Sequence, residues 1–149
     1  MIKLFREISK CICNQIESTI QTDQSLFVLC LNAYNYWVEQ ERDGNGYIFN
    51  VNDKSDLKYI VDKDVLSLKE IINIASNTGY FLISDDREIC QLKQNEILTL
   101  ISANLEYVIR CAILYVGRCG GDEKNPYVQL YEKYVTEVLE AKNYASYTF

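Results

Sequence analysis

The sequence predicts an α+β fold that is mainly helical, with about six helices and a small three-stranded antiparallel sheet. Apolar side chains recur every three or four residues over most of the 149 residues, which is typical of helices. Three short segments rich in β-branched and aromatic residues, 47–51, 80–83 and 88–93, break that pattern and are predicted to be strands. There is no linker and no internal repeat, so a single domain over residues 1–149 is expected.

Two helices are predicted before the first strand. Isoleucines recur every four residues within the segment 2–20, which places them on one helix face. Asp23 or Ser25 can cap a second helix that runs to about Glu41. Two glycines in the segment 43–46 then end that helix and lead into the strand at 47–51.

Two shorter helices are expected between the first and second strands. Asp53 can cap a helix that runs to about Asp62. Ser67 and Glu70 have the spacing of a capping box for the next helix, and Gly79 stands where a helix C-terminus favours glycine.

The remaining chain is predicted to form a hairpin and two helices. The segments 80–83 and 88–93 can pair across a turn at 84–87. A long apolar helix over 94–118 should be the most buried element, because apolar residues surround most of it. Pro126 suits the first position of the last helix.

The long helix is interpreted as a core helix and not as a membrane span. It contains Glu106 and Arg110, which are costly within a bilayer and can pair with each other at i,i+4. Arg6, Glu7 and Lys10 interrupt the N-terminus before any apolar run forms, so no secretory signal is expected. The predicted location is therefore the cytoplasm, with no membrane partner.

The order of elements from Gln24 to Lys93 is helix, strand, helix, helix, strand, strand, which resembles the winged-helix family. The resemblance implies that 67–78 is a recognition helix, that 84–87 is the tip of the wing, and that the flanking helices form a dimer interface. It implies a transcriptional regulator that binds DNA as a dimer, which is the alternative function. The recognition helix offers Lys69, Asn73 and Asn77 to a base edge, whereas Asp85 and Asp86 in the wing would face phosphate, so nucleic acid is not the favoured partner.

Catalysis lacks its usual side chains. No histidine is present, which excludes serine–histidine and cysteine–histidine nucleophile pairs and imidazole zinc sites. The six cysteines lack the spacing of a zinc site and are interpreted as reduced core thiols, although their even number also permits a disulfide framework. We expect no enzyme activity and no cofactor.

The segment 41–52 resembles a calcium loop of the EF-hand family. Asp43, Asn45 and Gly46 match loop positions three, five and six. Glu41 and Asn52 depart from the pattern at positions one and twelve, and Asn52 cannot supply the bidentate carboxylate that the family uses. We therefore expect no metal site.

Charge favours binding to a basic protein partner. The net charge is −6, and the stretch from residue 39 to residue 64 holds seven carboxylates against four basic residues. An anionic surface attracts cationic partners and can dock their arginines and lysines. We therefore predict an acidic inhibitor of the toxin-immunity type, a recurring bacterial protein class, whose partner is a basic protein such as a nuclease toxin. The predicted partner-binding residues are Glu39, Glu41, Asp43, Asp53, Asp56, Asp62 and Asp64.

Overall fold

A computed structural model describes residues 2–41, 46–84 and 86–136, apart from the side chains of 2–5, 41 and 134. Within these residues there are six α-helices and one three-stranded antiparallel sheet, which confirms the predicted fold class. In chain order the elements are α1 Ile2–Thr19, α2 Gln24–Glu41, β1 Ile48–Asn50, α3 Lys54–Asp62, α4 Leu68–Asn77, β2 Tyr80–Ile83, β3 Ile89–Gln91, α5 Gln94–Arg118 and α6 Pro126–Leu130, which continues as the π-helical turn η1 Tyr131–Val135.

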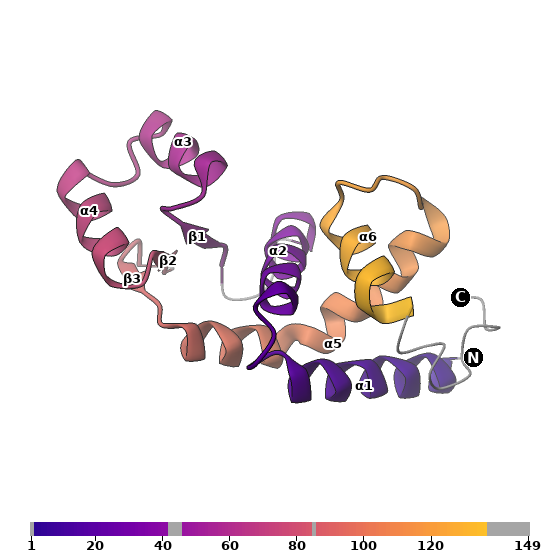
Figure 1. Ribbon diagram of the computed structural model, residues 1–149. Helices are drawn as coiled ribbons and strands as arrows, with labels where there is room; N and C mark the ends of the chain where they lie inside the picture. The colour runs from indigo at the N-terminus through magenta and orange to yellow at the C-terminus, as the bar shows by residue number, and fades with distance from the viewer. Residues whose placement is uncertain (1, 42–45, 85, 137–149) are drawn as a thin grey trace.

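The larger core lies among α1, α2, α5 and α6. Both α1 and α2 pack on α5, and α6 closes against α2 and α5 (Figure 1). Ile8, Ile12 and Ile16 of α1 are fully buried, as their four-residue spacing predicts. Each fully buried aliphatic side chain stabilises the fold by about 1.5–3 kcal/mol relative to an exposed one, so this bundle provides most of the stability.

The expectation that 94–118 would be the most buried element is wrong. The shorter helix α2 has more buried residues than α5. α2 lies in the middle of the molecule (Figure 1). The longer helix α5 contacts α1, α2 and α6, but it also has exposed residues along its length, such as Tyr107.

By length and composition alone, α5 is also the one helix among the described residues that could cross a membrane. A single helix of this kind is weak support for a membrane span, because the core helix of a soluble protein passes the same test. Its buried residues, including Ile101, Leu105 and Ile109, pack within the helical core.

A second, smaller core is formed by residues of the sheet, α3, α4 and the segments that connect them. β2 is the central strand and pairs with β1 and β3, with Phe81 opposite Phe49 and Leu82 opposite Cys90. This group of elements, residues 48–91, is the sheet module. In Figure 1 it lies near one end of α5, with α6 near the other end. The buried residues of its core are Val51, Ile60, Leu66, Ile74 and Phe81.

Local sequence signals set the ends of the module's helices. The Asp53 carboxylate accepts hydrogen bonds from the Ser55 and Asp56 N–H groups, which caps α3. Ser67 and Glu70 form the predicted capping box of α4. Gly79 follows α4 with φ of +79°, a left-handed conformation that glycine adopts without steric cost.

Of the six cysteines, two are buried, two are half-buried and two are exposed. Cys13 and Cys30 are buried, and loss of hydration raises the pKa of each thiol to about 12, so they behave as small apolar side chains. The expectation of core thiols is wrong for Cys90 and Cys119, which are exposed. Cys90 lies on the outer strand β3, and Cys119 follows the last residue of α5, so neither is covered by a second layer.

Candidate functional site

Helix α4 presents an outer face that the fold does not use. Successive residues on a helix are rotated by about 100°, so the face opposite buried Ile74 carries Lys69, Ile72 and Ser76, with Asn73 at its edge. All four are exposed. The side chain of Ile72 is 57% exposed even though it is a large apolar residue. A polar residue here would serve the fold equally well, so this face is a candidate contact surface.

A hydrogen-bonded chain of amides supports that face. The Asn77 Nδ2 group donates to Asn73 Oδ1 at 3.3 Å and to Gln91 Oε1 at 3.3 Å. Gln91 belongs to β3, so the Asn77 side chain adds a hydrogen bond between α4 and the sheet. The side chain of Asn73 is therefore oriented by its neighbours. These two hydrogen bonds involve its Oδ1 atom and not its NH₂ group.

The hairpin between β2 and β3 is the predicted wing. Its turn is closed by the Arg87 N–H donating to the Ser84 carbonyl at 2.9 Å and the Glu88 N–H donating to Ser84 Oγ at 3.1 Å. Arg87 is exposed and has φ of +60°, and Asp86 beside it is also exposed. Asp85 lies outside the described residues.

Helix α4 and the hairpin each carry one exposed basic side chain, Lys69 and Arg87. Neither Lys69 on α4 nor Arg87 on the hairpin forms an ion pair with any residue that the structure describes. Lysine and arginine in this state can meet phosphate oxygens without first breaking a salt bridge.

A buried asparagine ties the sheet module to α2. The Asn35 Nδ2 group donates to the Ile48 carbonyl at 2.9 Å, and the Ile48 N–H donates to Asn35 Oδ1 at 2.8 Å. The Tyr34 hydroxyl also donates to the Gly46 carbonyl at 3.0 Å. These bonds fix where β1 leaves the helical core, and the sequence analysis did not predict any of them.

Three of the predicted partner-binding acids lie near one tyrosine. Burial raises the pKa of the Tyr47 hydroxyl, and the charges of Asp56, Glu39 and Asp53 raise it further. Asp56 is half-buried and accepts a hydrogen bond from the Asn50 N–H at 2.9 Å. Asp53 caps α3, so two of these three carboxylates already have a role in the fold.

The other predicted acids do not join that cluster. Asp62 lies at the far end of α3 and pairs with Lys58 at 3.1 Å. Asp64 is exposed in the loop after α3 with φ of +52°, so it shapes the turn toward α4. The side chain of Glu41 and the whole of Asp43 lie outside the described residues. The single acidic surface over residues 39–64 remains a prediction.

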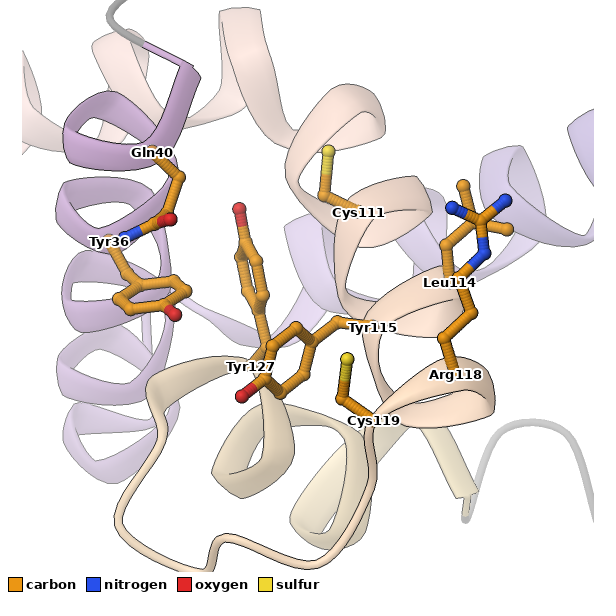
Figure 2. Close-up of a pocket in the computed structure, with 8 residues that line it drawn as sticks. All are labelled: Tyr36, Gln40, Cys111, Leu114, Tyr115, Arg118, Cys119 and Tyr127. Carbon is orange, nitrogen blue, oxygen red and sulfur yellow. The ribbon is translucent and has the colours of Figure 1, made fainter.

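A mainly apolar pocket of about 300 Å³ lies between α2, α5 and α6 (Figure 2). The rings of Tyr36, Tyr115 and Tyr127 gather there, and the Tyr36 and Tyr127 ring centroids are 4.8 Å apart in an edge-on arrangement. Figure 2 shows the Arg118 guanidinium turned away from the three rings. The pocket therefore has no cation aimed into it, and we interpret it as a gap in the packing of α6.

Metal binding has no support among the residues that the structure describes. No group of three or more cysteine, aspartate or glutamate side chains in that part of the chain could hold an ion. Residues 42–45 of the calcium-like loop lie outside the described residues, so this result does not test calcium binding by the loop.

Ile72, Ser76 and Gln91 are the site residues that sequence reasoning missed. A signal for Ile72 was present: Leu68, Ile71 and Ile72 give α4 more apolar residues than one buried face needs. Gln91 had no such signal, because its partner Asn77 comes from another element. Comparison of this chain with family models, with curated proteins and with solved structures found no match, so the functional argument rests on its own geometry.

Proposed function

We propose that this protein is a winged-helix regulator that binds DNA as a dimer, with α4 and the β2–β3 hairpin as its DNA-contacting face. The observation that carries the proposal is the outer face of α4, which is exposed and lies in the helix–strand–helix–helix–strand–strand order of that family. A helix of this size fits the major groove of DNA, which is about 12 Å wide.

The side chains on this face have distinct uses against DNA. Ile72 lies on the outward face of α4 and Asn73 at its edge, where side chains of a recognition helix reach base edges. Lys69 and Arg87 would contact phosphate oxygens, which fix the register of the protein on the duplex.

The net charge of −6 opposes DNA binding, and Asp86 and Glu88 flank Arg87 on the hairpin, but two carboxylates near α4 have partners within the fold. Asp62 is paired with Lys58, and Glu70 Oε1 accepts from the Ser67 N–H within the capping box. Charges separated by more than about 10 Å are largely screened at 0.1 M salt, so carboxylates far from this face weigh less than Lys69, Arg87 and the adjacent Asp86 and Glu88 do.

The proposed dimer compensates for the short stretch of DNA that one recognition helix can contact. A single α4 covers only a few base pairs, and dimeric winged-helix and helix-turn-helix proteins gain specificity by presenting two helices about 34 Å apart. The helices α1 and α5 lie outside the sheet module and are long enough to form the contact between two copies (Figure 1).

The experiment is selection of DNA from a pool of random duplexes, with the mass of the complex measured by sedimentation. The proposal predicts an enriched inverted repeat whose half-sites lie one helical turn apart, bound by two chains. Lys69→Glu and Arg87→Glu should each abolish enrichment. Lys124→Glu, an exposed change of equal charge in the loop before α6, should not. A pool that shows no enrichment with the wild-type dimer would contradict the proposal.

A second candidate is the acidic inhibitor of a basic protein, such as a nuclease toxin. The observation that favours it is the gathering of Glu39, Asp53 and Asp56 around Tyr47. Tyrosine beside carboxylates is a suitable anchor for a cationic partner. The test takes a basic nuclease toxin that this protein captures in a pull-down and measures its inhibition: Glu39→Lys should weaken the inhibition, and its failure to do so would count against this candidate.

A further inference from the structure

We infer that each DNA half-site contains A·T base pairs read by Asn73 and Ile72, an inference that rests on the proposed DNA-binding function. The argument uses three features of α4: an oriented amide, an exposed aliphatic side chain beside it, and the lack of an arginine on this helix.

The amide of Asn73 matches adenine. In the major groove adenine presents the N7 acceptor and the N6 donor, and an asparagine side chain can bond both at once. Asn73 Oδ1 accepts one hydrogen bond from Asn77, which leaves its second lone pair and its NH₂ group for the base.

Asn77 is a positioning residue for that contact. Its two N–H bonds go to Asn73 Oδ1 and to Gln91 Oε1, so both of its donors are used within the protein. Because an amide donates to Oδ1, the oxygen of Asn73 faces Asn77, and the orientation of its NH₂ group follows. A side chain held in this way loses less conformational entropy when it meets a base.

Ile72 matches thymine. Its side chain is 57% exposed on the outward face of α4, and Asn73 lies at the edge of that face. The C5-methyl group of thymine lies in the major groove and makes apolar contacts, which guanine and cytosine do not offer. An isoleucine buried against that methyl group recovers the free energy lost by exposing it to water.

Guanine has no matching reader on α4. The commonest guanine contact is a bidentate arginine or lysine, and Lys69 is the only cation of the helix. Lys69 is already assigned to phosphate in the proposed arrangement. The remaining outward residue, Ser76, donates its hydroxyl to the Ile72 carbonyl at 2.8 Å.

The test uses the site recovered by selection, with each base pair replaced in turn and affinities measured by fluorescence anisotropy. Wild type should prefer A·T over G·C by about tenfold or more at two neighbouring pairs of each half-site. Asn73→Ala should remove the preference at one pair, and Ile72→Ala at the other. Asn77→Ala should weaken the preference at the Asn73 pair alone, which separates positioning from contact. Lys69→Ala should lower affinity for all sequences alike.

The outcomes separate the inference from the function on which it rests. Specific DNA binding with G·C at these pairs, or with preferences unchanged by Asn73→Ala, would overturn the inference and leave the winged-helix function intact. A complete lack of DNA binding would overturn both. The variants change exposed side chains of α4, and circular dichroism of each establishes that it is folded before its affinity is compared.

Discussion

Asp56 shows at the scale of one residue how a carboxylate serves the fold at a cost. Burial raises its pKa, and the hydrogen bond from the Asn50 N–H lowers it in part, with a net rise. The Tyr47 hydroxyl lies 3.5 Å from Asp56 Oδ1 and is within reach of the same carboxyl group. Since the folded state holds the Asp56 proton more tightly than the unfolded state, ionisation of Asp56 costs the fold stability.

The pH dependence of stability should reveal this cost. A group whose folded pKa lies above its unfolded value stabilises the fold at low pH, and that stability is lost as pH rises from the ordinary carboxyl value through the raised one. In urea unfolding at a series of acidic pH values, Asp56→Asn should lack this loss. Asp86→Asn, on the exposed hairpin, is the control. A constant difference between wild type and Asp56→Asn at every pH would refute the assignment.

Gly79 is a second residue whose identity the backbone requires. Its φ is +79°, and a Cβ placed there would lie 2.7 Å from Asn52 Nδ2. Gly79→Ala should therefore cost about 1–2 kcal/mol for the left-handed conformation, plus the cost of moving Asn52. Gly121→Ala is a matched control, because Gly121 has φ of +93° and nothing within 4 Å of its Cβ position. Equal losses of stability in the two variants would show that contact with Asn52 does not matter.

At the scale of elements, capping residues made helix boundaries predictable. Asp53 and the Ser67–Glu70 box act as their sequence positions indicate, because a cap bonds within a few residues of itself. Pro126 stands in the first turn of α6, where its missing N–H is not needed. Register and burial depend on partners that are distant in sequence. The sequence predicted the strand at 80–83. It did not predict that α2 would be more buried than α5, because burial depends on such distant partners.

The joint between α2 and β1 can be tested by one substitution. Asn35→Ala would leave the buried N–H and carbonyl of Ile48 without their partner, which costs about 1–3 kcal/mol for each unsatisfied group. Unfolding should then begin in the sheet module, seen as faster amide exchange at 48–50. Asn32→Ala, on the exposed side of the same helix, should change little. Comparable losses in both variants would mean that the Asn35 bonds do not hold the module.

At the scale of the whole molecule, net charge was a poor guide to the site. The sequence showed seven carboxylates in one stretch, but it could not show that Asp53 is a cap, that Asp62 is paired with Lys58, or that Asp64 occupies a turn. Asn73 and Asn77 were identified as residues suited to bases, and their alignment by Gln91 required the folded sheet. Local geometry therefore decides which charges remain available to a partner.

The central claim is that α4 and the hairpin meet DNA phosphates, and the salt dependence of binding tests it most directly. Affinity for a selected duplex would be measured over a range of salt concentrations for the wild-type dimer, for Lys69→Ala, for Arg87→Ala and for the control Lys124→Ala. Each phosphate contact contributes about 0.9 to the slope of log affinity against log salt, so losing one contact per protomer should reduce the slope by about 2. We predict that reduction for Lys69→Ala and for Arg87→Ala, and an unchanged slope for Lys124→Ala. A wild-type affinity that does not depend on salt, or equal slopes in all four proteins, would contradict the account.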